Sequence, residues 1–257
     1  MNSCACNARF SAGRAIEAQR ILSRRLSLKW PGGEARRALG LDASYARVEG
    51  VDVGVGAAVL IDSSTLETLG CSLHIAPVCV PYIPGLLAFR ELQVMAPAAS
   101  ALAPHADVIL VDGHGIAHPR GFGIASHVGV VLGKPSVGVA KRRLVGEIAV
   151  LGGEKVVVSR GAPVAVVIDR PGGPIYVSPG HMIDLKTAVY VVKPLLKHRL
   201  PEPTRLADLL GRIARNGLKR QATLGKEWIE GCVVRASGCA RSLALRLEGL
   251  GFSVEVW

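Results

Sequence analysis

The chain has 257 residues and a mass of 27.0 kDa, which suits one large domain or one domain with a small appendage. Hydrophobic residues make up 49% of it, which excludes an intrinsically disordered protein. Aromatic residues make up only 4%, so the core must be aliphatic. The formal net charge of +11 favours a polyanionic partner.

The positive charge is concentrated in two segments. Residues 1–37 carry a net charge of +6 and residues 193–226 a net charge of +7, whereas 38–192 and 227–257 each carry −1. One interpretation is that these segments are solvated helix faces of a basic protein. The other is a phosphate-binding rim around a central site, whose affinity would fall steeply with salt.

The termini and the cysteines indicate a cellular compartment. No stretch of 18 apolar residues is free of charge, and residues 1–10 lack the apolar core of a signal peptide. The six cysteines form no zinc-type pair of C-x-x-C motifs. We therefore expect a cytoplasmic protein with no membrane partner, in which most cysteines are reduced and pack as small hydrophobes. A bridge between Cys232 and Cys239 is left open.

Apolar periodicity predicts the secondary structure in chain order. The predicted strands are 47–61, 66–77, 106–111, 136–140, 164–169 and 175–178. The predicted helices are 13–27, 84–102, 121–132, 184–196 and 204–215, the fourth with Asp184 as its N-cap. Early strands pair through a turn at 62–64 and later strands alternate with helices, so we expect an α/β domain with a mixed sheet.

The last part of the chain has a different pattern. Residues 228–236, 239–250 and 252–257 predict a strand, a helix and a strand. This small C-terminal strand–helix–strand extension forms either an appended module or a last layer on the main sheet. We divide the chain into a catalytic domain, 1–217, which includes the basic N-terminal helix, and an extension of open role, 218–257.

Three acidic residues indicate a metal site. Asp52 lies among Val and Gly in a predicted strand, and Asp112 ends the apolar run 106–111. A carboxylate in such a position is costly unless it is paired or binds a metal. Together with Glu91 from a predicted helix, these carboxylates form a hard oxygen site that suits Mg²⁺ or Mn²⁺. The alternative is that both aspartates cap turns or pair with arginines.

Other catalytic signatures are excluded. His114 and His118 are four residues apart, as in zinc metalloproteases, but no Glu follows His114 and the neighbouring glycines and proline predict a loop. The segment 129–135 has the wrong glycine spacing for a phosphate-binding loop, and no G-x-S-x-G motif is present.

Several sequence blocks together resemble the endonuclease V family. The three longest are G-V-D-V-G at 50–54, P-Y-I-P-G-L-L-A-F-R-E at 81–91 and V-D-G-H-G-I-A-H-P-R at 111–120. Shorter blocks follow at 125–127, 138–141, 180–181 and 200–208. They occur in the family's order over about residues 45–215. The second and third blocks are long and specific.

The resemblance implies a ribonuclease H-like fold, a mixed β-sheet flanked by helices. It also implies a DNA repair endonuclease that depends on Mg²⁺, for which Mn²⁺ can substitute. Such an enzyme nicks DNA containing deoxyinosine at the second phosphodiester 3′ to the lesion and leaves 3′-hydroxyl and 5′-phosphate ends. We expect a monomer. Two alternatives stay open: an endoribonuclease specific for inosine in RNA, and a non-catalytic nucleic-acid-binding protein.

The resemblance also assigns roles to individual residues. Asp52, Glu91 and Asp112 match the metal-binding carboxylates. His181 matches a histidine that orients the attacking water or a second metal's shell, and Lys141 matches a lysine that contacts the phosphate. A wedge that separates the strands at the lesion corresponds to Pro81, Tyr82, Ile83 and Pro84. The pocket for the extruded base corresponds to Gly85, Leu87, Gly115, His118 and Ile124.

Overall fold

The computed structural model describes residues 10–48, 50–218, 233–236, 248 and 252–256. Its helices are α1 (Ala12–Ser23), α2 (Leu87–Ala99), α3 (Ile124–Leu132), α4 (Leu185–Val192) and α5 (Glu202–Leu218), with short 3₁₀ turns at Ala103–His105 and Lys193–Leu195. Its strands are β1 (Arg37–Val48), β2 (Val51–Asp62), β3 (Thr68–Pro77), β4 (Val108–Val111), β5 (Ser136–Ala140), β6 (Glu147–Leu151), β7 (Glu154–Ser159), β8 (Ala162–Ile168), β9 (Ile175–His181), β10 (Val233–Ala236) and β11 (Ser253–Val256).

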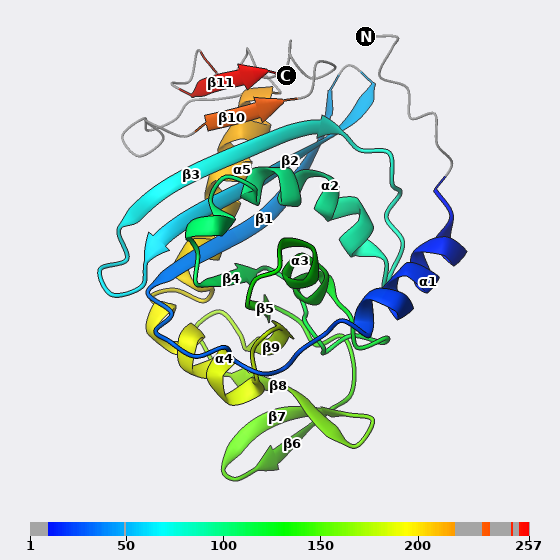
Figure 1. Cartoon of the computed structure of the whole chain (residues 1–257), viewed down its shortest axis with the longest axis vertical. Coiled ribbons are helices and arrows are strands. Elements are labelled where there is room, and N and C mark those ends of the chain that lie inside the picture. The colour runs from blue at the N-terminus through cyan, green and yellow to red at the C-terminus, as the bar shows by residue number, and fades with distance from the viewer. Residues whose placement is uncertain (1–9, 49, 219–232, 237–247, 249–251, 257) are drawn as a thin grey trace.

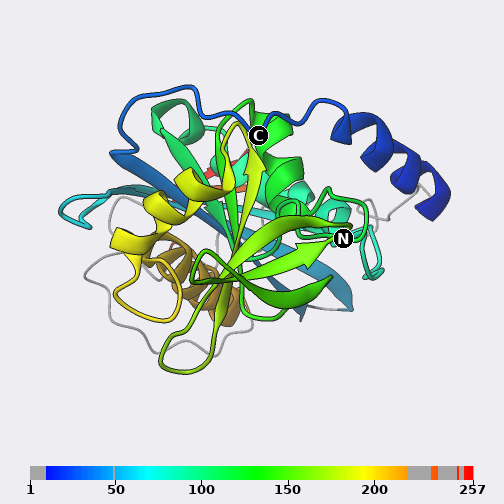
Figure 2. The ribbon, with the colours of Figure 1, turned by 90° about the horizontal axis from the view of Figure 1, so that it is seen from below.

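The described strands form one mixed sheet in the order β11-β10-β3-β2-β1-β4-β5-β9-β8-β7-β6. β1, β4 and β5 run parallel at its centre, and antiparallel strands lie directly on both sides of them. One apolar layer joins the sheet to α2 and α3, and another joins its opposite face to α4 and α5. Figure 1 shows this arrangement, and Figure 2 shows it from below. It is the mixed α/β architecture that the sequence predicts.

The central strands are buried on both faces. β2 is apolar and buried from Val53 to Ile61, as expected of a strand covered by helices on either side. Glycines let the two helix layers approach closely. A Cβ at Gly56 would lie 2.1 Å from the carbonyl oxygen of Val94 on α2. A Cβ at Gly40 would lie 2.1 Å from the carbonyl carbon of Pro203 on α5. The backbones of both helices therefore lie directly against the sheet.

One predicted strand is wrong, and three strands of the structure were largely or wholly missing from the prediction. The segment 47–61 is not one strand, because β1 ends at Val48 and the chain turns at Gly50, whose φ is +83°, before β2 begins. Most of β1 was not predicted at all, nor was the hairpin of β6 and β7, whose outer strand is largely solvent-exposed. In β1 the alternation of apolar and polar residues that marks a strand is interrupted by small and polar residues. The strand is therefore hard to recognise from the sequence.

Other local predictions are confirmed. β2 and β3 form a hairpin, and its turn is held by Asp62, whose Oδ1 accepts a hydrogen bond from the Ser64 N–H at 2.8 Å. Asp184 is the N-cap of α4, since its Oδ1 accepts from the Thr187 N–H at 2.8 Å. Helix α2 begins at Leu87 rather than at 84, because Gly85 has a φ of +78° and belongs to the preceding turn.

The C-terminal strands extend the main sheet. β10 pairs parallel to β3, and β11 pairs parallel to β10 (Figure 1). Of the two placements considered for this segment, these strands adopt the last layer on the main sheet. Most of the predicted helix between them lies outside the described residues. The division of the chain at residue 217 stays a prediction.

Two cysteines are exceptions to the expectation that most are reduced, and the other four lie outside the described residues. Cys71 and Cys79 are both disulfide-bonded. Spacing motifs report zinc sites but carry no information about cysteines that the fold brings together, so this bonding had no sequence signal. The pair Cys232 and Cys239 lies outside the described residues. Among the helices described, none is long and apolar enough to cross a membrane.

His127 is a titratable group in the aromatic contact between α2 and α3. The residue is 4% exposed, and its ring centroid lies 5.0 Å from that of Phe89 and 5.2 Å from that of Phe122. Burial lowers the pKa of His127 from 6.5 to about 4. The unfolded chain therefore binds a proton at this histidine more readily than the folded protein does.

Acid should destabilise the protein through His127. The folded state is favoured as long as His127 is neutral in the unfolded chain as well, which holds above pH 6.5. As the pH falls from 6.5 towards 4, the unfolded chain takes up a proton at His127 that the folded protein does not, and the folded state loses free energy relative to it. The unfolding free energy should be measured by chemical denaturation at pH 7.5 and at pH 5. Between these two pH values, His127→Phe should lose about 2 kcal/mol less of it than the wild type does. Replacing the exposed His105 by Gln is the control, and this variant should lose as much unfolding free energy between the two pH values as the wild type. Equal losses in the wild type and His127→Phe would contradict the prediction.

Candidate active site

The parallel pairing of β1 with β4 places two aspartates side by side. Leu41 is the register partner of Val111, and the next residues on the two strands are Asp42 and Asp112. Neighbouring strands are about 4.8 Å apart, so these carboxylates are close neighbours. Asp112 follows the last residue of β4, at the carboxyl end of the central parallel strands, which is where α/β sheets usually place their ligands.

Two helices add carboxylates from opposite faces of the sheet. Glu91 lies on α2, and Asp208 lies on α5. The hydroxyl of Ser44 on β1 donates a 3.0 Å hydrogen bond to the Gly211 carbonyl, which fixes α5 one turn beyond Asp208. The charge of Asp208 acts on Asp42, and the charges of Asp42 and Asp112 act on Glu91. The four acidic residues Asp42, Glu91, Asp112 and Asp208 are called the carboxylate cluster below.

The carboxylate cluster resists full ionisation. Burial, and then the charges of Asp112 and Asp208, raise the pKa of Asp42 to about 7. Burial, and then the charges of Asp42 and Asp112, raise the pKa of Glu91 to about 8. Both shifts have the same origin, because a carboxylate that loses water and meets like charges is stabilised by its proton. A bound cation would remove that penalty.

Lys141 supplies a positive charge next to the carboxylate cluster. It directly follows β5, and its Nζ lies 2.5 Å from Oδ2 of Asp112. Burial alone would lower the pKa of Lys141, but its hydrogen bond to Asp112 and the charges of Asp112, Asp42 and Asp208 raise it overall. The lysine is therefore a firmly protonated ammonium beside the cluster.

The cluster has the chemistry of a divalent-cation site, although its side chains do not form a finished coordination shell. Within the part of the chain that the structure describes, no three His, Cys, Asp or Glu residues meet the geometry of a metal-binding group. The donors are nevertheless all carboxylate oxygens, which suits Mg²⁺ or Mn²⁺. The Oε2 atom of Glu91 is buried with no hydrogen-bond partner. A cation would satisfy that oxygen, so the residues present fit the metal.

The structure does not bring Asp52 to the cluster. Asp52 is exposed near the start of β2 and pairs in register with Arg47, five residues beyond Asp42 on β1. At about 3.3 Å per residue it lies about 17 Å along the strand from the cluster. The neighbouring strand β1 instead contributes Asp42, for which the sequence predicted no role.

His181 also lies away from the cluster. It pairs in register with Ser136 at the start of β5, whereas Lys141 follows the end of that strand. The two residues are therefore about 17 Å apart along the sheet. The Nδ1 of His181 accepts a 3.3 Å hydrogen bond from the Ser27 N–H, in the segment that runs from α1 to β1 across the molecule (Figure 1). This contact anchors that segment.

Both missed acids had a signal in the sequence. Asp42 ends the apolar run 38–41, just as Asp112 ends 106–111. Asp208 closes the block 200–208, which resembles the endonuclease V family, and its carboxylate is part of that block. Gly40 and the hydroxyl of Ser44 bring α5 against β1 beside Asp42, so the tertiary contact decides which acids meet.

A pocket adjoins the carboxylate cluster. It has a volume of about 220 Å³ and lies between the loop before α2 and the segment before α3. This volume is below the roughly 300–1,000 Å³ that is typical of pockets for drug-sized ligands, so the pocket has room only for a smaller group. Its lining consists of Gln19, Tyr82, Pro84, Gly85, Leu87, Ala88, Gly113, His114, His118, Gly123, Ile124 and Leu144. We call it the base pocket, after the extruded base that the resemblance assigns to several of these residues.

The base pocket contains four of the five residues predicted for it, namely Gly85, Leu87, His118 and Ile124. Gly115 stands behind the wall, where a Cβ would lie 1.8 Å from the Pro179 carbonyl oxygen. Of the predicted wedge, Tyr82 and Pro84 line the pocket, and Pro81 and Ile83 lie beside them in the chain. Tyr82 is 68% exposed, so the loop presents an aromatic side chain to the solvent.

The base of that loop is anchored next to the cluster. Arg90 precedes Glu91 on α2, and its Nη1 donates a 2.5 Å hydrogen bond to the Val80 carbonyl. Its guanidinium lies 4.3 Å from the ring centroid of Tyr45. The loop bearing Tyr82 is thus connected to the helix that carries Glu91.

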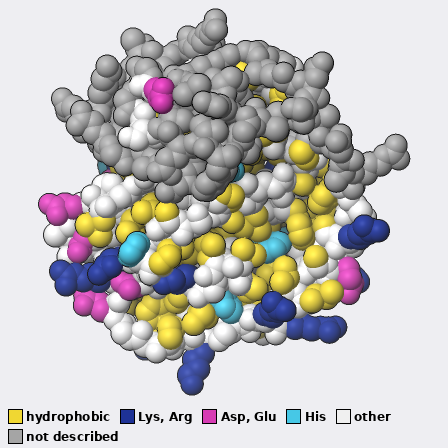
Figure 3. All heavy atoms as spheres, turned by 45° about the horizontal axis from the view of Figure 1, so that its top comes forward, with side chains coloured by type: hydrophobic (Ala, Val, Ile, Leu, Met, Phe, Trp, Pro, Cys, Tyr) yellow, Lys and Arg dark blue, Asp and Glu magenta, His cyan; other side chains and the backbone are white. Residues whose placement is uncertain are grey.

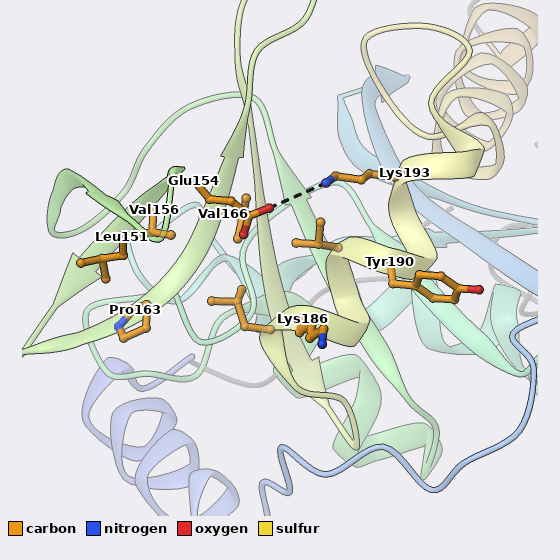
Figure 4. Close-up of a pocket in the computed structure, with 10 residues that line it drawn as sticks. Leu151, Glu154, Val156, Pro163, Val166, Lys186, Tyr190 and Lys193 are labelled. Carbon is orange, nitrogen blue, oxygen red and sulfur yellow. Dashed lines mark ion pairs between the residues drawn. The ribbon is translucent and has the colours of Figure 1, made fainter.

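A second and larger cavity lies away from this chemistry. It has a volume of about 550 Å³ and lies between α4 and the outer strands, lined by Leu151, Val166 and Tyr190 among others (Figure 4). Its charged residues include Lys193 and Glu154, whose charged atoms are 3.8 Å apart. It contains none of the carboxylate cluster.

On the face shown in Figure 3, apolar side chains occupy most of the middle of the described surface, and Lys and Arg lie mostly towards its edges.

Comparison with known proteins gives one consistent result. Residues 20–209 match the family described as Endonuclease V. Over 257 aligned residues the chain is 46% identical to an endonuclease V of Aeropyrum pernix, covering 99% of this chain and 100% of that protein. The fold matches the crystal structure of an endonuclease V from Streptomyces avermitilis with a TM-score of 0.74 and 35% identity, over 84% of this chain and 96% of that one. This likeness confirms the predicted fold.

One further solved structure contains nucleic acid. It is an endonuclease V of Ciona intestinalis in complex with a 23mer DNA containing an inosine followed by a ribo-adenosine. It is 26% identical to this chain, with a TM-score of 0.68, and the match covers 78% of this chain and 95% of that one.

Cation binding should depend on Asp42 and not on Asp52. Thermal unfolding with and without Mn²⁺ should show a cation-dependent rise in Tm for the wild type and for Asp52→Asn. At about 100 times the Kd this corresponds to about 2.7 kcal/mol. Asp42→Asn should show no cation-dependent rise in Tm. Without metal it should be more stable than the wild type, because the substitution relieves like-charge repulsion. The reverse pattern in the two variants would contradict the assignment.

Proposed function

This chain belongs to the endonuclease V family, and we propose that it nicks DNA at the second phosphodiester 3′ to deoxyinosine, leaving 3′-hydroxyl and 5′-phosphate ends. Family membership makes the chain a metal-dependent nuclease of DNA repair, which excludes the non-catalytic alternative. We propose Mg²⁺ as its metal and Mn²⁺ as a substitute. Substrate, cut position and metal identity belong to the proposal.

One juxtaposition carries the proposal. Asp112 belongs to the carboxylate cluster, and the next residue, Gly113, lines the base pocket. A nucleotide whose base enters the pocket would therefore have its backbone beside the cluster. A nuclease that acts near a modified base needs this arrangement, because base recognition and phosphodiester hydrolysis must occur on the same strand.

We assign the metal to Asp42, Glu91 and Asp112, with Asp208 completing the cluster. When bound, the cation would supply Lewis acidity at the scissile phosphate and a more acidic water. Lys141 is protonated at the edge of the cluster, where its ammonium would offset charge that develops on the phosphate oxygens. Asp52 and His181 receive no role in the chemistry, because each lies about 17 Å along a strand from these groups.

The base pocket and the exposed tip of its loop account for lesion recognition. Extruding a base costs least when its pair is weak, as for hypoxanthine. Tyr82 would occupy the vacated stack, as apolar wedges do in kinked duplexes. The basic segments 1–37 and 193–226 would hold the phosphates on either side, although part of each lies outside the described residues.

Inosine in RNA is the second candidate substrate. The Ciona protein was crystallised with DNA containing an inosine followed by a ribo-adenosine, so the strand in that complex carries a 2′-hydroxyl 3′ to the inosine. The same carboxylate cluster and base pocket would serve either substrate, and contacts to the 2′-hydroxyl decide between them.

A nicking assay tests the proposed function. An end-labelled duplex with one deoxyinosine should be cut once, 3′ to the lesion, only when Mg²⁺ or Mn²⁺ is present. Asp42→Asn should abolish the product, because the cation loses a ligand, and Asp52→Asn should retain it. The matched riboinosine substrate shows which nucleic acid is preferred. No cleavage of either substrate by folded, metal-loaded protein would refute the proposal.

Removing the wedge should affect duplexes selectively. Tyr82→Ala should weaken binding to a deoxyinosine duplex by about tenfold, because one stacking contact is worth roughly 1–3 kcal/mol. Binding to single-stranded DNA with the same lesion should change by less than about threefold, since no strand separation is needed. Fluorescence anisotropy with Ca²⁺ in place of Mg²⁺ measures both. An equal loss on the two substrates would assign Tyr82 to the pocket instead of the wedge.

A further inference from the structure

The side chain of Gln19 connects the N-terminal helix to both walls of the base pocket. Gln19 lies on α1 and is 1% exposed. Its Nε2 donates to the carbonyl oxygen of Gly85 at 3.1 Å and to that of Phe122 at 3.3 Å. Gly85 belongs to the loop before α2, and Phe122 to the segment before α3. One amide group therefore spans the two segments between which the pocket lies.

A third hydrogen bond fixes the orientation of this amide. The Oε1 of Gln19 accepts from Nε of Arg120 at 2.6 Å. Because Nε2 faces two carbonyl oxygens and Oε1 faces a guanidinium, the amide has only one orientation that satisfies all three partners. Both amide hydrogens are used, so Gln19 has no donor left for a base in the pocket.

Several side chains converge on Gly85. Nη2 of Arg120 also donates to the Gly85 carbonyl, and His118 makes a hydrogen bond to the Gly85 backbone. Gly85 has a φ of +78°, and a Cβ there would lie 2.8 Å from Nη2 of Arg120. The loop that carries Tyr82 is thus held at one backbone residue by groups from α1 and from the opposite wall.

We propose that Gln19 is a positioning residue that sets the width of the base pocket and thereby the discrimination between inosine and ordinary bases. The inference rests on the proposed function of the base pocket. Gln19 acts through Gly85 and Phe122, which it holds at a fixed separation. A purine that fits this gap is retained, and a looser gap would bind the lesion less tightly without changing the carboxylate cluster.

Two substitutions at Gln19 test this inference. Gln19→Met keeps the length of the side chain but removes all three hydrogen bonds. Gln19→Glu keeps the acceptor for Arg120 and places an oxygen against the carbonyls of Gly85 and Phe122. Glu17→Ala is the control, because Glu17 is exposed on the same helix and, among the described residues, forms an ion pair only with Arg20, at 3.5 Å.

The Gln19 variants should bind deoxyinosine DNA less tightly but cleave it at nearly the wild-type rate. Each Gln19 variant should raise the Kd for deoxyinosine DNA about tenfold, equally on duplex and single strand, while the Kd for undamaged DNA changes less than twofold. The single-turnover cleavage rate at saturating enzyme should stay within about threefold of the wild type, because the cluster is untouched. An equal loss of affinity for damaged and undamaged DNA, or an unchanged discrimination ratio, would overturn the inference.

Hydrogen exchange tests the same point without a substrate. In the free protein, Gln19→Met and Gln19→Glu should speed amide exchange in peptides covering 80–88 and 113–123 but not in β2. This readout also separates the two proposals. If wild-type protein does not recognise inosine, the proposed function fails, whereas unchanged exchange in both peptides refutes the role of Gln19 even in an active enzyme.

Discussion

The parallel pairing of β1 with β4 is the contact on which the candidate active site depends. It aligns Leu41 with Val111 and so places Asp42 beside Asp112. The helices can reach this point only because Gly56 and Gly40 let α2 and α5 lie directly on the sheet. Larger residues at these glycines would push out the helices that carry Glu91 and Asp208. The packing of the core therefore determines the geometry of the carboxylate cluster.

This arrangement opposes stability. Four carboxylates in a partly desolvated site repel one another, and the raised pKa values of Asp42 and Glu91 are the result. Lys141 pairs directly with Asp112 and also lowers the pKa of Asp42, but the pKa of Asp42 stays raised overall. A site of this kind is poised to bind a cation, because a metal relieves repulsion that the protein alone retains.

The base pocket shows how distant segments make one surface. Its walls come from the loop before α2 and the segment before α3, and α1 joins them through Gln19. The segment after α1 is held in turn by two hydrogen bonds of Ser27: its N–H donates to Nδ1 of His181, and its carbonyl oxygen accepts from the Met182 N–H. Helix α1 is therefore joined to both walls of the base pocket through Gln19, and His181 anchors the segment that follows this helix.

The sequence by itself determined the α/β class, most helices, and the two long motifs that contain Glu91, the base-pocket loop and Asp112. Those motifs are continuous in the chain, so local spacing is enough to recognise them. Only the tertiary structure placed Asp42 and Asp208 near Glu91 and Asp112, and placed Asp52 and His181 away from them. An acid beside an apolar run looks the same whichever strand it ends. Its neighbours depend on strand register and on which end of the sheet it occupies, and these are set by long-range pairing and by helices packed close against glycines.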